Sequence, residues 1–454
     1  MANNDWPDRR LAWGAVAILT IAQFVNALDR YLINLLVEPI KADLQVSDTQ
    51  IGLLLGLAFA IFYTFMGLPI GRWADTYSRR LIIACGLLFW SLMTMACGLA
   101  QNFKQLFAAR MAVGAGEASL NPCGYSLISD YFPSESRATP MGVFIVGAGV
   151  GSAVVLYGGG HLVDYLTVNQ ITWPLPWGGH LKPWQIAFVI AGLPGLAVML
   201  LIGLMKEPPR RELATFADAT AQDKGAPRRA LPVAAIVAYA RNHAAAYLTI
   251  FFGIGMSLLW LMGNITWAPS YLIRTFDWSA SEAGGAMALI MLFGNSIGVV
   301  GGGYVSERIA KRGYKDAHLR TAFFGTLIAL PFAVAAPLIA SPSLSVLLLI
   351  PAFLFGSFPL SLAPAAIAAI TPNQMRAQLT ALYLLTINLL GYGAGPAVIG
   401  GITDHLYGDP ELVGHSMATV AACALPVSLL LLWWGMAVFG RTVKELELAS
   451  RTTP

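Results

Sequence analysis

Charged residues are scarce in this chain. Only 11% of its 454 residues are Asp, Glu, Lys or Arg, and 57% are hydrophobic, whereas about 25% of the residues of an average soluble domain are charged. This shortage excludes an ordinary soluble domain and is typical of a membrane protein. The spacing of the four cysteines, Cys85, Cys97, Cys123 and Cys423, matches neither a disulfide framework nor a metal site, so we expect no bound metal.

Catalytic and nucleotide-binding motifs are also missing. The sequence contains no phosphate-binding loop of the form GxxxxGKS or GxxxxGKT, so nothing indicates that ATP drives the protein. It contains no HExxH motif and no nucleophile elbow, and His161 and Asp164 lie near the end of a hydrophobic run, where such residues are usually interfacial. We therefore expect no enzyme activity, no cofactor and no nucleic-acid partner.

Long hydrophobic runs are present instead, each able to cross a hydrocarbon core roughly 30 Å thick. They predict an all-α membrane protein with twelve transmembrane helices. The first run is too long for a cleavable signal peptide and lacks a small-residue cleavage site, so we expect the first helix to be retained. The expected spans are 12–37, 51–72, 81–100, 104–130, 138–165, 184–205, 244–272, 280–305, 319–340, 343–369, 375–402 and 413–439.

The distribution of Lys and Arg predicts the orientation of these spans. If the N-terminus is cytoplasmic, the loops on the opposite side contain only four of the 28 basic residues, which are Lys41, Lys104, Lys182 and Arg274. Cytoplasmic loops carry an excess of positive charge. We therefore expect both termini in the cytoplasm and the protein in the plasma (inner) membrane.

The span at 104–130 carries two ionisable residues, Arg110 and Glu117. Their separation of seven residues, about two helical turns, places them on one face. Charge inside a membrane helix is costly and by default marks a cavity, a partner or a substrate path. Asp29 of the first span lies at about the same depth as Arg110, so the two can pair, either in a substrate path or as a structural ion pair that fixes helix packing.

An internal repeat divides the chain. A shift of 232 residues aligns the loop after the second span with the loop after the eighth. Two six-helix repeats joined by a linker are the organisation of a secondary transporter whose substrate site lies between the halves. We expect an N-terminal bundle over residues 1–205, a cytoplasmic linker over 206–243, a C-terminal bundle over 244–440 and a cytoplasmic tail over 441–454.

These two loops resemble the signature loop of the major facilitator superfamily and its degenerate second copy. The resemblance implies the major facilitator fold, in which two six-helix bundles surround a central cavity and alternate between inward-open and outward-open states, in a monomer. It also implies that the loops form a conformational latch that stabilises the outward-open state. The residues that carry the resemblance are Gly71, Asp75, Arg79 and Arg80 in the first copy and Glu307, Lys311 and Arg312 in the second.

Most of the N-terminal half also resembles, more specifically, the spinster family of proton-coupled lipid transporters. Gln185 departs from this resemblance, because a base is expected after the tryptophan at the start of the sixth span. The residues that carry it are Asn26, Asp29 and Arg30 in the first span, Arg110, Gly114, Gly116, Glu117 and Ala118 in the fourth, Trp184 and Phe188 in the sixth, and the EPPRR segment at 207–211.

The C-terminal half differs in kind. Its spans contribute Asn264, Asn388 and aromatic side chains such as Trp260, but no ionisable residue at mid-membrane depth. A cavity with one polar wall and one apolar wall fits a substrate that has a charged head and a hydrocarbon portion better than it fits a sugar.

These observations predict a transporter of an amphipathic, anionic or zwitterionic lipid-like substrate of the lysophospholipid or sphingolipid type, working by proton-coupled alternating access. Asp29 and Glu117 are the candidate proton-coupling carboxylates. The candidate ligands of the substrate are Arg30, Arg110, Asn26, Asn264 and Asn388. The alternative is a proton-coupled symporter of small organic anions such as sugar acids, whose family pattern shares the Asn, Asp and Arg arrangement of the first span.

Overall fold

The computed structural model describes residues 6–133, 136–176, 178–210 and 233–452. Within them, eleven helices or continuous helical stretches are long and apolar enough to cross a membrane. Side chains as apolar as Leu68, Leu204, Val300 and Trp433 are exposed on their surfaces, as lipid-facing positions require. The expected all-α membrane fold is therefore confirmed, while the exact count of twelve spans stays a prediction.

The missing twelfth candidate is the expected span 104–130, which is divided into α6 (Phe103–Glu117) and α7 (Leu120–Tyr131). Neither helix alone reaches the length of a span. Pro122 has no N–H to donate to the carbonyl of Ala118, four residues earlier, and this breaks the helical ladder. At the break, the backbone N–H of Ser119 bonds to the carbonyl of Gly116, three residues earlier, at 3.2 Å.

The chain forms two compact units. Unit 1 contains residues 1–33, 61–155 and 165–230, and unit 2 contains 34–60, 156–164 and 231–454. Unit 2 thus includes one end of the first, second and fifth spans together with the C-terminal half. The domain boundaries expected from the sequence stay a prediction, and residues 211–232 of the expected linker lie outside the described residues.

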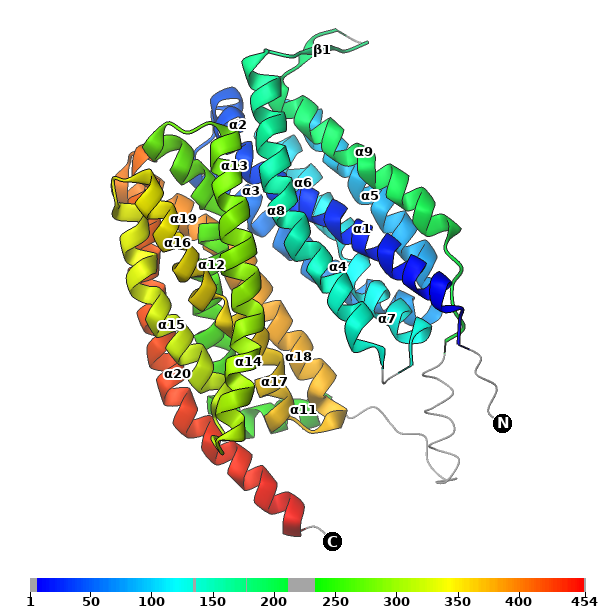
Figure 1. Cartoon of the computed structure of the whole chain (residues 1–454), viewed down its shortest axis with the longest axis vertical. Coiled ribbons are helices and arrows are strands. Elements are labelled where there is room, and N and C mark those ends of the chain that lie inside the picture. Colours follow the sequence, from blue (N-terminus) through cyan, green and yellow to red (C-terminus); the bar gives the residue numbers. More distant parts are fainter. Residues whose placement is uncertain (1–5, 134–135, 177, 211–232, 453–454) are drawn as a thin grey trace. The chain divides into compact units, whose positions relative to one another are not determined.

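Unit 1 is built from the other parts of the first six spans. Its elements are α1 (Arg9–Leu35, up to Ile33), α4 (Leu57–Thr76, from Ile61), α5 (Arg79–Gly98), α6, α7, α8 (Ala138–Val168, up to Val155 and from Tyr165), β1 (Trp173–Pro174), β2 (His180–Leu181) and α9 (Pro183–Leu204). The pair β1 and β2 is a short antiparallel ribbon between α8 and α9, drawn at the end of α8 in Figure 1. No strand was expected here from the sequence.

Unit 2 contains the helices of the C-terminal half. They are α11 (Val233–Asn242), α12 (Ala244–Phe276), α13 (Ala280–Leu289), η2 (Ile290–Ser296), α14 (Ile297–Lys311), α15 (Ala317–Ala335), η3 (Ala336–Leu338), α16 (Pro342–Gly356), α17 (Phe358–Ile370), α18 (Asn373–Ile387), η4 (Asn388–Ala394), α19 (Gly395–Ile402), η5 (Thr403–Tyr407), η6 (Pro410–Leu412) and α20 (Val413–Thr452). It also contains α2 (Val37–Leu44) and α3 (Asp48–Leu55).

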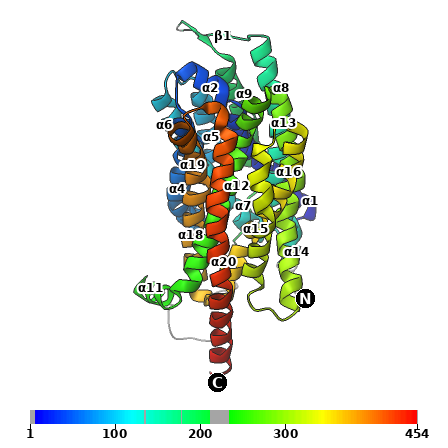
Figure 2. The ribbon, with the colours of Figure 1, turned by 90° about the vertical axis from the view of Figure 1, so that its left-hand side faces the viewer.

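Helix α12 forms the centre of unit 2, because 78% of its most apolar window is buried inside the structure. It packs against α20, which also packs against α15 (Figure 1). Helix α20 continues without interruption to Thr452, so the expected tail at 441–454 extends the last span as far as it is described (Figure 2). Residues 441–452 include no Pro or Gly that would end the helix.

The short helix α11, at the end of the expected linker, is anchored to unit 2. The hydroxyl of Tyr239 donates a hydrogen bond of 2.7 Å to the carbonyl of Ile370, the last residue of α17. Figure 2 shows α11 projecting at the end of the unit.

Candidate functional site

Polar side chains gather in the interior of unit 1, between α1, α4 and the junction of α6 and α7. We call this group the polar cluster. Its members are Gln23, Asn26, Asp29 and Arg30 on α1, Tyr63 on α4, Arg110 and Glu117 on α6 and Asn121 on α7.

Glu117 lies at the centre of the polar cluster and is completely buried. Its Oε2 accepts a hydrogen bond of 2.6 Å from Asn26 Nδ2 and one of 2.8 Å from Arg30 Nε. Its Oε1 has no hydrogen-bond partner within the described part of the chain. The side chain of Arg30 is 21% exposed, so this cation reaches from a buried carboxylate toward an accessible surface.

Asp29 and Arg110 form a second contact between α1 and α6 within the polar cluster. Both are 2% exposed, and Arg110 Nη1 donates a hydrogen bond of 3.1 Å to the backbone carbonyl of Asp29. The Arg110 charge also acts on the Asp29 carboxyl, which has Thr94 and Trp90 nearby. Neither carboxyl oxygen forms a standard hydrogen bond with a described residue. Asp29 is thus a buried acid whose carboxyl group lies beside Thr94, Trp90 and the charge of Arg110.

Three members of the polar cluster, Gln23, Tyr63 and Asn121, are not among the site residues expected from the sequence. Gln23 Nε2 donates to Asn121 Oδ1 at 2.7 Å, and Asn121 Nδ2 donates to the Tyr63 hydroxyl at 3.1 Å. The guanidinium carbon of Arg30 lies 4.9 Å from the centre of the Tyr63 ring, a geometry that attracts a cation to an aromatic face. The one available signal was that Asn121 follows Glu117 by four residues in the expected span 104–130, a spacing that puts two residues on one side of a continuous helix.

The two candidate asparagines of the C-terminal half lie in unit 2. Asn264 is fully buried and donates to the carbonyl of Trp260 in its own helix, at 2.9 Å. Its Oδ1 is unsatisfied within the described residues. Asn388 is half-buried and opens the π-helical segment η4, a rare conformation that often occurs at functional sites.

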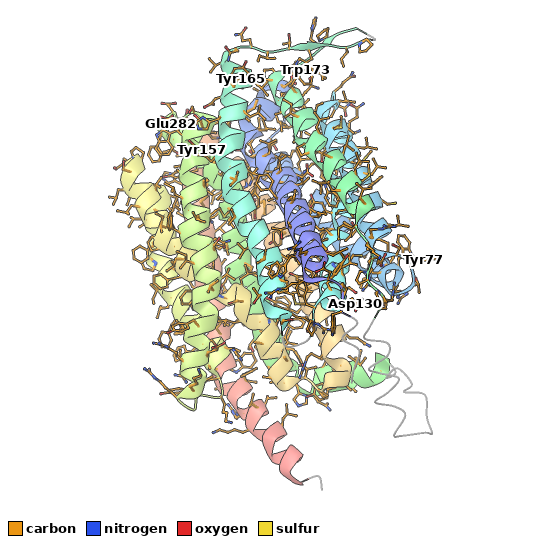
Figure 3. The ribbon with its side chains drawn as sticks, turned by 45° about the vertical axis from the view of Figure 1, so that its right-hand side comes forward. Tyr77, Asp130, Tyr157, Tyr165, Trp173 and Glu282 are labelled. Carbon is orange, nitrogen blue, oxygen red and sulfur yellow. The ribbon has the colours of Figure 1, made fainter. Side chains whose placement is uncertain are left out.

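The candidate latch residues of the first loop bond within unit 1. Arg79 is buried and pairs with Asp130 of α7 and, at 3.2 Å, with Glu207 after α9. Arg80 donates a 2.6 Å hydrogen bond to the carbonyl of Met205. The side chain of Asp75 is exposed, while Gly71 lies inside α4. Figure 3 shows Asp130 and Tyr77 at the same end of unit 1.

Residues Glu207 and Arg210, which we call the clamp, hold this loop from outside. Glu207 accepts hydrogen bonds from the hydroxyl of Ser78 and the backbone N–H of Arg79, at the N-terminus of α5. Arg210 donates to the carbonyls of Ala74 and Tyr77, at 2.8 and 2.6 Å, at the C-terminus of α4. An acid at a helix N-terminus and a base at a C-terminus both complement the helix dipole.

The second copy of the loop has a different environment in unit 2. Glu307, Lys311 and Arg312 are exposed at the end of α14, and Arg312 is its C-cap residue. The buried hydroxyl of Ser306 contacts His318 Nδ1 at 2.9 Å. The latch function of both copies stays a prediction.

In the part of the chain that the structure describes, no three His, Cys, Asp or Glu side chains come together as a metal site would require. The ionisable groups of the polar cluster are the carboxyl groups of Asp29 and Glu117 and the guanidinium groups of Arg30 and Arg110. Guanidinium groups can bind anions and carboxylates can take up protons.

Comparisons with known proteins identify relatives of this chain. An MFS-type efflux pump of Mycolicibacterium smegmatis is 30% identical over 98% of this chain and 97% of its own. A probable L-galactonate transporter of Escherichia coli is 30% identical over 67% of this chain and 64% of its own. The crystal structure of a bacterial homologue of the human lysosomal transporter spinster, inward-facing and unoccupied, superposes with a TM-score of 0.75 at 26% identity, covering 96% of this chain and 98% of that one.

The similarity to a spinster homologue confirms the finer resemblance, and relatives that are transporters show that this integral membrane protein is a transporter rather than an enzyme. The family model of the Major Facilitator Superfamily matches residues 19–396. This chain therefore belongs to the Major Facilitator Superfamily.

Proposed function

We propose that the protein moves an amphipathic, anionic or zwitterionic lipid of the lysophospholipid or sphingolipid type across the plasma (inner) membrane by proton-coupled alternating access. The observation that carries this proposal is the bond between the fully buried Glu117 and the partly exposed Arg30. One cation is shared between a carboxylate that can take a proton and a surface that a substrate can reach.

The coupling follows from competition for Arg30. A phosphate or carboxylate head group suits the planar guanidinium, which forms paired, charge-assisted hydrogen bonds with such anions. When Arg30 turns to the head group, Glu117 loses its cation in a buried position, where an unpaired charge is costly. Proton uptake then restores a neutral interior, so substrate binding and protonation become linked.

Asp29 and Arg110 form the second part of the proposed coupling site. Arg110 is held against the backbone of Asp29, so that its charge offsets that of the carboxylate when no proton is bound. A proton on Asp29 removes this interaction and changes how α1 and α6 attract each other. Coupling requires that proton and substrate bind the two conformations differently.

The lipid-like substrate is supported by the contrast between the polar cluster and unit 2. Unit 2 offers Asn264 and Asn388 as uncharged polar groups, among aromatic side chains such as Trp260. We propose that Asn264 and Asn388 bind the substrate, that apolar side chains of unit 2 contact its hydrocarbon portion, that the protein works as a monomer, and that both termini lie in the cytoplasm.

The competing proposal is a symporter of small organic anions such as sugar acids. The probable L-galactonate transporter among the relatives supports it, since a pair of arginines also suits a small carboxylate. The two proposals share the proton-coupling residues and differ in the substrate.

Uptake into proteoliposomes with an imposed pH gradient separates the two proposals. Labelled lysophospholipid and labelled galactonate are measured in the same vesicles, each with the other as unlabelled competitor, and vesicles containing Arg30→Gln serve as the control for specific uptake. We expect gradient-driven lysophospholipid uptake that galactonate does not inhibit. Gradient-driven galactonate uptake with no lysophospholipid uptake would establish the competing proposal.

A further inference from the structure

Two sets of contacts in unit 2 join the N-terminal repeat to the C-terminal repeat, and both have the same hydrogen-bonding arrangement. Each set places a carboxylate from one repeat on the first N–H groups of a helix from the other. The carboxylates belong to Asp404 and Asp164.

The first set joins the start of η5 to the start of α3. Asp404 Oδ1 accepts a hydrogen bond of 3.2 Å from the backbone N–H of Asp48. Asp404 Oδ2 accepts bonds of 2.6 Å from both the backbone N–H and the hydroxyl of Thr49. The first N–H groups of a helix have no partner in their own helix, so this carboxylate satisfies donors that would otherwise need water.

The second set joins the end of α8 to the start of α13. Asp164 Oδ1 accepts from the backbone N–H of Ala280 at 3.0 Å, and Oδ2 accepts from that of Ser281 at 2.9 Å. Figure 3 shows Glu282 of α13 and Tyr157 of α8 at this end of unit 2.

The two sets are related by the internal repeat. The shift of 232 residues that aligns the signature loops also carries Asp48 onto Ala280 and Thr49 onto Ser281. It carries the N-cap Ser47 onto the N-cap Ser279, and each serine forms a capping box, with Gln50 and Glu282 respectively. A shift of 240 residues carries Asp164 onto Asp404.

Four glycines allow the close approach in both sets. A Cβ atom on Gly160 would overlap the carbonyl oxygen of Ala280, and one on its repeat partner Gly400 would overlap that of Asp48. A Cβ atom on Gly284 or Gly52 would likewise overlap backbone atoms of the opposing helix. The carboxylate caps therefore form only when the paired backbones are in contact.

Arg274 at the end of α12 reinforces one of the two sets. Its guanidinium donates to both carboxyl oxygens of Asp48, at 2.8 and 2.9 Å, and to Glu38 of α2 at 2.8 Å. The second set has no corresponding ion pair, because Ala280 occupies the position that aligns with Asp48.

We infer that Asp164 and Asp404 form a twofold-repeated gate, in which each carboxylate caps the helix that opens the second span of the other repeat. Under the proposed orientation this gate closes the outer side, and it must release four backbone N–H groups and the hydroxyl of Thr49 for that side to open. Water can replace the carboxylates when the repeats part, so the gate opens reversibly. The inference rests on the alternating-access part of the proposed function and not on the identity of the substrate.

Distance measurements between spin labels test the gate without any substrate, so their outcome is independent of the lipid assignment. The labels are attached at Ala42→Cys and His415→Cys, both exposed residues of unit 2 from different repeats, after replacement of the four native cysteines. The test variant is Asp164→Asn with Asp404→Asn, which keeps the shape of each side chain but replaces one acceptor oxygen with a donor. The matched control is Asp409→Asn, since Asp409 caps only its own loop, through the N–H of Glu411 at 2.9 Å.

We expect one short label distance in the unmodified protein and in Asp409→Asn. In the double variant, the ratio of long to short distances should rise by about tenfold or more, because two caps are weakened. A double variant with the distance distribution of the control overturns the inference, and so does an equal change in the control. If the double variant does not fold, Gly160→Ala with Gly400→Ala is measured in the same way. This second variant should show the same increase, and an unchanged distribution likewise overturns the inference.

Discussion

Arg30 Nε and Glu117 Oε2 lie 2.8 Å apart, and the two side chains differ sharply in exposure, at 21% and 0%. The buried carboxylate depends on a cation whose other side is accessible. A ligand that takes this cation therefore changes the charge balance inside unit 1 without entering the interior itself.

Replacing Glu117 with Gln should remove the pH dependence of transport. Glutamine keeps an oxygen that can accept from Arg30 and Asn26 but cannot take up or release a proton. Substrate uptake by the variant, measured over a pH series, should therefore be flat where that of the unmodified protein changes. Glu445→Gln, at an exposed position of α20, should retain the original profile, and a normal profile in Glu117→Gln would contradict the coupling mechanism.

Changes at Tyr63 should separate the ring from the hydroxyl. Tyr63→Leu removes the aromatic face beneath Arg30 and should weaken substrate binding about two- to fivefold, as loss of a cation–π contact of about 0.5–1 kcal/mol implies. Tyr63→Phe retains the face, loses the hydroxyl that accepts from Asn121, and should have a smaller effect. Equal losses of affinity in the two variants, measured by ligand-binding titration, would show that the ring does not support Arg30.

The clamp should make stability depend on pH through Glu207. Partial burial alone would raise the pKa of this carboxyl, but hydrogen bonds from Ser78 and Arg79 outweigh it and hold the pKa below its ordinary value of 4.5. A lowered pKa in the folded state stabilises the protein at neutral pH, and the contribution is lost as the pH falls through the folded-state value.

Glu207→Gln should therefore lower the unfolding temperature by about 2 °C at pH 7, the amount expected for loss of a helix cap. The difference in unfolding temperature from the unmodified protein should shrink as the pH falls below the pKa of an ordinary glutamate. Thermal unfolding in detergent, with the exposed Glu445→Gln as the control, measures this difference. A difference in unfolding temperature that stays constant down to acid pH would mean that the charge of Glu207 does not contribute to stability.

Helix packing in unit 1 should be sensitive to single methyl groups. A Cβ atom on Gly98 would overlap the backbone carbonyl of Gln185 in α9, whereas one on Gly14 would meet nothing within 4 Å. We expect Gly98→Ala to destabilise the fold by about 1–3 kcal/mol and Gly14→Ala to leave stability unchanged or raise it by up to about 1 kcal/mol. Thermal unfolding of the two variants provides the comparison, and similar melting temperatures would contradict the packing of α5 on α9.

Most of the helices could be predicted from the sequence because hydrophobic length is a strong constraint in a membrane. The expected spans 184–205 and 280–305, for example, correspond to α9 and to the stretch from α13 to α14. The break between α6 and α7 was missed because composition was weighed over the whole run, while a single residue, Pro122, decides the hydrogen bonding there. The missing N–H of one proline thus divides a helix that the hydrophobicity of the whole run predicts as continuous.

The polar cluster could be predicted only in part, for a related reason. Charged residues such as Arg30 and Glu117 are conspicuous in an apolar helix, since their cost demands an explanation. Tyr63 is inconspicuous among the aromatics of its span, and its role depends on how α4 turns toward α1. That rotation is set by tertiary packing, which residue type alone does not encode.

The clamp has a practical consequence for dividing the protein. A cut placed directly after α9, at the boundary that hydrophobicity suggests, would remove Glu207 and Arg210 and expose the end groups of both α4 and α5. Any expression of the N-terminal repeat as a separate fragment should therefore extend at least to Arg210, which makes these few polar residues part of that repeat rather than of the tether that follows.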